Sequence, residues 1–334
     1  MQFLLRRLVL TIPVLLGVSL IVFTIMHVIP GDPVQVMFAG TGATEEQLTA
    51  MRHALGLDRP LPVQYVDYVA RAVRGDFGQS IHFKQPVLDL ILERMPATVE
   101  LAVASLIVAL GIAFPVGILS ALKRNTVIDY IAMTGATLGI SLPTFWVGIL
   151  CIMVFAVSLG WLPGSGRVDY AVHLERVTGF LVLDSLLTRN WPALKDTLAH
   201  LVLPAGSLGI AVATFTTRLM RSSMLEVIGK DYVVTARAKG LRERLIITRH
   251  VLRNALIPVV TLVGVQMGGL LGGAVISETI FAWPGIGRLV IQAIYNRDFL
   301  LVQGVVLFFA LLSIIINLLT DVLYVWIDPR ISHI

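Results

Sequence analysis

The sequence predicts an all-α polytopic membrane protein with six transmembrane helices and a long segment after the first of them. Of the 334 residues, 56% are hydrophobic and only 14% are charged, and the mean hydropathy is +0.85. A soluble domain carries about 25% charged residues. The apolar residues fall into six runs, each long enough at about 1.5 Å per residue to cross about 30 Å of hydrocarbon. The single cysteine, Cys151, excludes an intrachain disulfide.

The six spans are predicted at roughly 8–29, 98–122, 132–158, 199–220, 258–282 and 301–325. The first follows Arg6-Arg7, but its apolar run is too long for a signal peptide, so we expect it to be retained. The third contains Pro143, which removes a helical hydrogen bond, and we expect a kink between Gly139 and Pro143.

Six spans place both termini on one side of the membrane, and the basic residues decide which side. The totals of Lys and Arg on the two sides nearly tie, so the short loops, which count most, are decisive. The loop 123–131 carries Lys123 and Arg124, whereas the long segment 30–97 balances its basic residues with eight acids. Both termini are therefore predicted to be cytoplasmic.

The segment 30–97 is predicted to be extracytoplasmic and structured. Turn residues surround Asp32, two amphipathic helices are expected at 45–57 and 61–74, and the second stops before Asp76. We divide the chain into 1–97, the first span with this segment, and 98–330, a five-helix core with a cytoplasmic loop at 218–257. An irregular cap over the outer mouth and a contact for a soluble binding protein both explain the segment.

The stretch Arg218 to Pro258 is the longest polar, helix-forming segment of the chain, and it holds nine basic residues against three acidic ones. Its centre, Asp231 to Gly240, combines small side chains with a glycine that ends a helix. Small side chains let a helix approach a partner closely, so we expect a short docking helix here. A solvated basic loop that holds anionic lipid headgroups is the alternative.

The fifth predicted span carries Gly264, Gly268 and Gly272 at four-residue intervals, a pattern that permits close helix packing. Ordinary packing explains such a stripe, and so does a path through the membrane or a seam with another membrane protein. Glu278 is expected near the outer end of the same span, where an acid is costly unless it is paired or wetted.

The centre of the basic stretch, DYVVTARAKG followed by RHVLRNALIP, resembles the cytoplasmic loop by which permeases of ABC importers contact their ATPase subunits. The triplet Glu-Ala-Ala of the general pattern is here Val234-Thr235-Ala236, a departure typical of the peptide-transporter branch. The resemblance implies an ATPase-coupling role for seven residues: Asp231, Tyr232, Thr235, Ala236, Ala238, Lys239 and Gly240.

Further runs resemble the B-type permease of dipeptide and oligopeptide importers, namely HVIPGDP, LGLDRP, GDFGQS, LPGSGR and SETIFAWPGIGR. The resemblance implies the type I importer permease fold in a bacterial inner membrane, a second homologous permease, two ATPase subunits that bind ATP and Mg²⁺, an extracytoplasmic binding protein and a peptide substrate. We assign binding-protein contacts to Asp32, Asp76 and Arg167. The path or permease seam is assigned to Pro143, Gly264, Gly268, Gly272 and Glu278.

The sequence supports functions other than a peptide permease to different degrees. A permease of the same branch for nickel, glutathione or another small solute remains open. An ion-coupled carrier is disfavoured because mid-membrane ionisable chains are lacking. A membrane enzyme lacks a nucleophile–base pair, and no GxxxxGK[ST] sequence is present to bind ATP in this chain. Basic residues gathered in one loop without interleaved aromatics argue against nucleic acid as a partner.

Overall fold

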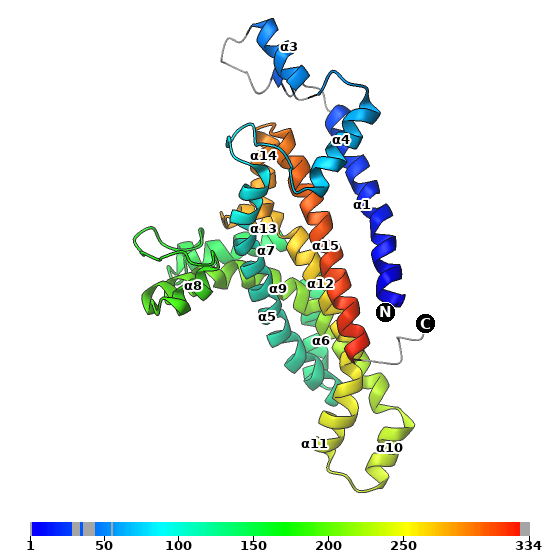
Figure 1. Ribbon diagram of the computed structural model, residues 1–334. Helices are drawn as coiled ribbons and strands as arrows, with labels where there is room; N and C mark the ends of the chain where they lie inside the picture. Colours follow the sequence, from blue (N-terminus) through cyan, green and yellow to red (C-terminus); the bar gives the residue numbers. More distant parts are fainter. Residues whose placement is uncertain (1, 29–33, 36–43, 55, 328–334) are drawn as a thin grey trace. The chain divides into compact units, whose positions relative to one another are not determined.

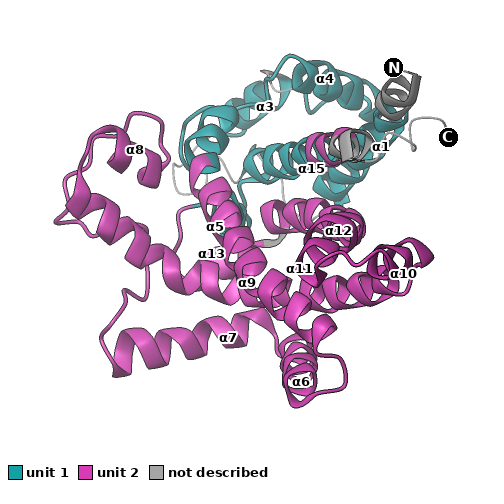
Figure 2. Ribbon diagram, turned by 90° about the horizontal axis from the view of Figure 1, so that it is seen from below, with its two compact units in different colours: residues 1–95, 285–314 teal, residues 96–284, 315–334 magenta. Residues whose placement is uncertain are grey.

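The computed structural model describes residues 2–28, 34–35, 44–54 and 56–327, and every regular element in that part of the chain is helical (Figure 1). The chain divides into two compact units, coloured in Figure 2, and the division falls inside two long helices, α5 (Val87–Leu122) and α15 (Phe299–Ile327). Unit 1 comprises residues 1–95 and 285–314. Unit 2 comprises 96–284 and 315–334.

Unit 1 holds the first predicted span and the segment after it. Its complete helices are α1 (Gln2–Val28), α3 (Glu45–Ala54), α4 (Leu61–Val73) and α14 (Ile286–Tyr295). The two amphipathic helices expected at 45–57 and 61–74 are thus confirmed with slightly earlier ends. The core packs the start of α5 against α14 and α15 through eight buried apolar residues: Val87, Leu90, Ile91, Ile286, Leu289, Ala293, Leu301 and Val305.

A buried carboxylate closes this core. Asp298 precedes α15 and accepts a hydrogen bond from the Leu301 backbone N–H, as an N-cap residue does. Its other oxygen accepts from the Ser80 hydroxyl at 2.5 Å and from the His82 N–H at 3.0 Å. Asp298 therefore fixes the turn at 80–83 to the start of α15.

Unit 2 is built around α9 (Trp191–Ile228), a helix of 38 residues that packs against most of the other helices of the unit. These are α6 (Val127–Ser141), α7 (Thr144–Cys151), α8 (Leu181–Leu187), α10 (Asp231–Ala238), α12 (Leu252–Gly273) and α13 (Val275–Ile280). Two π-helical segments, η1 (Ile152–Ser158) and η2 (Ile246–Val251), extend α7 and join α11 (Glu243–Leu245) to α12.

Glycine allows α5 to approach α9 closely. A Cβ on Gly209 would lie 2.8 Å from the Ser105 carbonyl oxygen of α5, nearer than real Cβ contacts come.

The prediction of six spans is confirmed if one broken pair is counted as a single span. Among the described residues, five helices are long and apolar enough to cross a membrane, at Leu10–Val28, Val87–Leu122, Trp191–Ile228, Glu243–Gly272 and Phe299–Thr320. The sixth consists of α6 and α7–η1, which meet at an angle of 100°.

In two of the predicted spans, the helix breaks completely or ends earlier than predicted. The expected kink at Pro143 is a full break, because Pro143 and Leu142 both leave the helical conformation. The fifth span is shifted toward the N-terminus, and its helix ends at Gly273, so Glu278 lies in the separate short helix α13.

Candidate functional site

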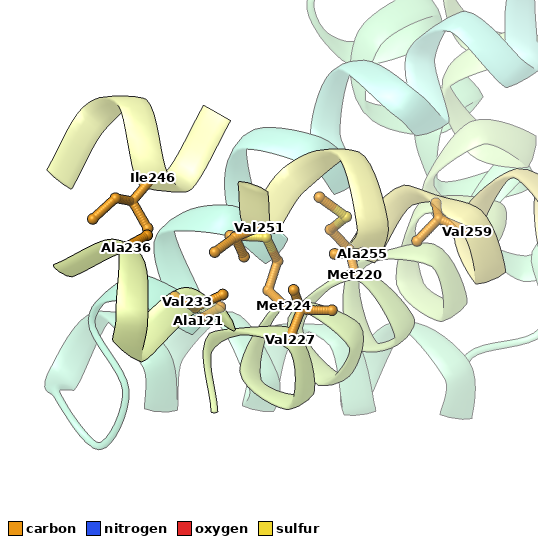
Figure 3. Packing of buried hydrophobic residues seen from close by; sticks show 10 residues of the cluster. All are labelled: Ala121, Met220, Met224, Val227, Val233, Ala236, Ile246, Val251, Ala255 and Val259. Atoms are coloured by element: carbon orange, nitrogen blue, oxygen red, sulfur yellow. The ribbon is translucent and has the colours of Figure 1, made fainter. Parts of the chain in front are cut away.

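The loop predicted to contact an ATPase is a helical hairpin that follows directly after α9 in the chain. After Gly229 and Lys230 the chain enters α10, turns at Gly240 and returns through α11 and η2 into α12. One face of α10 belongs to the core of its own chain, since Val233 is fully buried and Ala236 is 7% exposed. They join a cluster formed with α9 and α12 (Figure 3): Ala121, Met220, Met224, Val227, Ile246, Val251, Ala255 and Val259.

The opposite face of α10 is open. Asp231, Val234, Thr235 and Ala238 follow the spacing i, i+3, i+4, i+7, which places them on one side of a helix, and all four are exposed. Val234 has 55% of its surface exposed although it is apolar. We call these four residues the outer stripe of α10. Tyr232 and Lys239 flank it and are exposed as well.

The end of α10 is fixed by backbone conformation and by charge. Gly240 has φ of +76°, in the left-handed region that favours glycine, and its N–H donates to the Arg237 carbonyl. The Arg237 guanidinium binds the Glu243 carboxylate across this turn at 2.7 Å, and this hydrogen-bonded pair raises the pKa of Arg237. The outer stripe thus lies on a helix whose end is fixed by the turn at Gly240 and by the Arg237–Glu243 pair.

An ion pair with a buried carboxylate supports the base of the hairpin. The Asp129 carboxylate, at the start of α6, binds the Arg221 guanidinium of α9 at 2.6 and 2.7 Å. It also accepts hydrogen bonds from the Ser120 hydroxyl and the Asn125 N–H. One carboxylate therefore joins α5, the turn at 123–126, α6 and α9, directly beside the cluster that carries α10.

The three glycines of the predicted stripe in α12 have different surroundings. A Cβ on Gly264 would overlap the Thr320 side chain of α15, so this glycine serves packing within the chain. A Cβ on Gly268 would only touch Ile316 at 3.9 Å, and one on Gly272 would meet nothing within 4 Å. The part of the stripe around Gly268 and Gly272 is therefore open to a partner or a path.

The other two residues assigned to the path belong to different elements. Pro143 is the residue before α7, at the break between α6 and α7. Glu278 is fully buried in α13, where its carboxylate accepts a hydrogen bond from the Thr98 hydroxyl at 2.7 Å. The neighbouring Trp283 is also fully buried and donates its indole N–H to the Ala97 carbonyl. Glu278 thus helps to join α13 to α5.

Arg167, predicted as a binding-protein contact, points into its own chain. Its guanidinium binds the Glu100 carboxylate at 2.6 and 2.9 Å and lies over the Trp283 ring, 5.8 Å from the centroid. The two side chains are only 11% and 7% exposed. Burial lowers the pKa of Arg167, and the charge of Glu100 opposes that shift.

Glu100 also accepts a hydrogen bond from the Val182 N–H, so this pair holds the segment 159–190 against α5. Asp184 orders the same segment internally. Burial alone would raise the pKa of its carboxyl, but hydrogen bonds from the Thr178 hydroxyl and N–H and the Gly179 N–H bring it below its usual value.

The other two predicted binding-protein contacts lie in the N-terminal part. Asp76 is exposed, and its carboxylate accepts a hydrogen bond from the Gly78 N–H, which shapes the turn after α4. Asp32 lies outside the described residues.

Sequence reasoning missed three carboxylates that hold the structure together: Glu100, Asp129 and Asp298. Asp129 and Asp298 stand in or just before the first turn of an apolar helix, a position that favours a capping acid. That signal was available for both. Glu100 lies inside an apolar run, where an unpaired carboxylate is energetically unfavourable. That was the only signal in the sequence that Glu100 has a partner.

Comparison with known proteins agrees with this architecture, and the chain belongs to the family of binding-protein-dependent transport system inner membrane components. The model of that family matches residues 113–333, and the model of its N-terminal part matches residues 1–102. The family is one of multi-pass permease subunits, so this chain is a membrane component of an ABC transporter rather than an enzyme.

Relatives match over the whole chain. The di/tripeptide transport system permease protein of Pseudomonas aeruginosa is 44% identical over 333 residues, which is 100% of this chain and 99% of the relative. The dipeptide transport system permease protein of Escherichia coli K12 is 44% identical over 336 residues, with the same coverage.

Two solved structures share the fold. A methionine ABC transporter in an inward-facing conformation matches with a TM-score of 0.53 and 18% identity, over 72% of this chain and 96% of its own. An amino acid ABC transporter matches with a TM-score of 0.51 and 11% identity, over 71% and 93%.

Proposed function

We propose that this chain is the permease subunit of an ATP-driven importer for dipeptides and other short peptides. In this proposal it acts with a second homologous permease, two ATPase subunits that bind ATP and Mg²⁺, and an extracytoplasmic binding protein that delivers the peptide. Relatives that match the full length are named as dipeptide and di/tripeptide permeases, which supports the substrate class.

The observation that carries the coupling role is the division of α10 into two faces. Val233 and Ala236 fix the helix to the cluster beneath it, and the outer stripe is left exposed on a rigid support. A short stripe of small and apolar residues lets a partner approach the helix backbone closely. We infer that the outer stripe is the surface that enters the ATPase subunit, and that Ala236 contributes by packing within the permease.

Two arginine substitutions on α10 test this division. Ala238→Arg places a long charged side chain on the outer stripe, so ATPase recovery on the tagged permease should fall while permease abundance stays normal. Ala236→Arg places the same side chain in the cluster, so permease abundance itself should fall. Arg242→Ala, beyond the turn and exposed, serves as the control and should change neither quantity. Full ATPase recovery and uptake with Ala238→Arg would remove the outer stripe as the docking surface.

Substrate class is tested separately in the purified complex with its binding protein. We expect dipeptides to stimulate ATP hydrolysis in proteoliposomes, with no stimulation by Ni²⁺ or glutathione. Stimulation by Ni²⁺ or glutathione alone would assign the chain to another solute of the same branch.

The proposed topology places both termini in the cytoplasm. A thiol introduced at Gln47, which is exposed on α3, or at Ser165 in the segment 159–190 should react with an impermeant reagent from outside. Labelling that occurs only in inverted vesicles would reverse the orientation.

A further inference from the structure

Helix α4 lies across the C-terminal half of α1 and is fixed there by specific contacts. The Tyr65 hydroxyl donates to the Leu16 carbonyl at 3.2 Å and lies 2.9 Å from the hydroxyl of Ser19, which is 5% exposed. The Phe23 ring packs against the rings of Tyr65 and Tyr68, with centroids 5.4 and 6.1 Å apart. In Figure 1, α4 lies beside α1 within the same unit.

These contacts set the depth of α4, because α1 is a membrane span. The apolar stretch of α1 runs from Leu10 to Val28. At 1.5 Å per residue, Phe23 lies about 7.5 Å inside the Val28 end of α1 and Ser19 about 14 Å inside it. The hydrocarbon core is about 30 Å thick, so the Tyr65 hydroxyl reaches close to its midplane. Helices that lie in a membrane interface are buried by about 5 to 10 Å, the depth at which α4 meets Phe23.

The surface that α4 turns away from α1 is apolar and uncovered by the described part of the chain. Val63, Val66, Ala70 and Val73 follow the spacing i, i+3, i+7, i+10 and form one stripe along the helix. Val66 is 64% exposed and Val73 is 81% exposed. The polar residues Asp67 and Arg71 stand together at one edge of this stripe, between it and the face that contacts α1.

Polar groups at the beginning of α4 have partners, as a site near hydrocarbon requires. The Gln64 amide N–H donates to the Leu57 and Arg59 carbonyls, and its oxygen lies 3.1 Å from the His27 ring. Asp67 pairs with the Arg59 guanidinium at 3.0 Å. The beginning of α4 is therefore closed by hydrogen bonds.

We propose that α4 is an interfacial helix whose stripe of Val63, Val66, Ala70 and Val73 contacts acyl chains in the leaflet that holds the C-terminal half of α1. Exposed apolar residues of α1 at the same depth, Leu20, Ile21 and Ile25, face the same lipid layer. The continuity in depth favours lipid over a soluble partner. The inference rests on α1 as a span and is independent of substrate and orientation.

Nitroxide labels read by electron paramagnetic resonance test this placement in the full-length chain. The protein carries Cys151→Ser and a single label at Val66→Cys, and it is reconstituted in phosphatidylcholine/phosphatidylglycerol vesicles. Collision with oxygen reports the hydrocarbon, and collision with a water-soluble nickel chelate reports the aqueous phase. Ile25→Cys on α1 is the lipid reference and Gln47→Cys on α3 is the aqueous reference.

We expect the label at Val66→Cys to show an oxygen-to-nickel accessibility ratio several-fold above that at Gln47→Cys and near that at Ile25→Cys. A second stripe position, Ala70→Cys, should agree, and Arg71→Cys on the polar edge should be more accessible to nickel. A ratio at both stripe positions equal to that at Gln47→Cys would overturn the proposal in favour of water. Exclusion of both reagents at the stripe would overturn it in favour of a protein contact.

Discussion

The hairpin around α10 and the segment 159–190 each contain an arginine that binds a glutamate at nearly the same distance. Arg237 binds Glu243 at 2.7 Å, and Arg167 binds Glu100 at 2.6 Å. The first pair is 39% and 54% exposed, the second 11% and 7%. Water solvates the ions of the exposed pair whether or not they meet, whereas each ion of the buried pair depends on its partner.

A third pair, Arg221 with Asp129, lies between these two. Its side chains are 24% and 4% exposed, and the carboxylate keeps hydrogen bonds from Ser120 and Asn125. The distance between the charged atoms is therefore a poor guide to how much an ion pair contributes to stability here. We expect the loss of stability on breaking each pair to follow the burial of the pair and the hydrogen bonds that its carboxylate keeps. Three arginine substitutions can test this order.

Arg167→Ala should have the largest effect. It leaves the Glu100 carboxylate buried beside the Val182 N–H donor but without its counter-charge, and breaking a buried pair in this way costs about 3 to 5 kcal/mol. Thermal unfolding of the purified permease in detergent should show a clear loss of stability. Asp76→Ala, at an exposed turn, is the control and should leave the unfolding curve nearly unchanged. Wild-type stability of Arg167→Ala would mean that water reaches Glu100.

Arg221→Ala should have an intermediate effect. Two donors still face the Asp129 carboxylate and Arg221 is partly solvated, so we expect a loss of about 1 to 3 kcal/mol. Because the pair supports the cluster under α10, ATPase recovery should fall along with stability. A loss as large as that of Arg167→Ala would contradict the order derived from burial.

Arg237→Ala should have the smallest effect, about 0 to 1 kcal/mol, since both ions are exposed. Permease abundance and unfolding should stay close to wild type, and added salt should change them little. If this substitution destabilises the chain as strongly as Arg221→Ala, the turn at Gly240 depends on the pair more than its exposure indicates.

A glycine pair extends the same contrast from charge to packing. Gly264→Leu would force a side chain into Thr320 and should cost about 1 to 3 kcal/mol, since overpacking strains both helices. Gly272→Leu meets open space within this chain and should leave its stability unchanged. Loss of complex assembly with Gly272→Leu, at normal permease stability, would place a second permease at this face.

Much of this arrangement could be predicted from the sequence, because hydropathy and turn residues act locally. The spans, the amphipathic helices α3 and α4 and the short helix α10 all follow from runs of about forty residues or fewer. The break at Pro143 was predicted in position but not in size. Proline fixes where the helical hydrogen bonds fail, while the angle of 100° depends on how α7 packs against α9.

Residues on α10 show where sequence reasoning stops. Ala236 and Ala238 are equally small and only two positions apart, yet one is buried and the other exposed. An eight-residue helix in which both faces carry small or apolar side chains gives no sign of which face meets its own chain. Partners such as Glu100 and Arg167, separated by 67 residues, are likewise invisible until the fold brings them together.

The length of α9 has a mechanical consequence. Its first residues follow the segment that Glu100 clamps to α5, and its last residues pass directly into the turn before α10. Thirty-eight residues at 1.5 Å each make a rod of about 57 Å, so a tilt of about 5° displaces one end by about 5 Å relative to the other. One helix therefore connects the segment held against α5 to the turn that leads into α10 and its outer stripe.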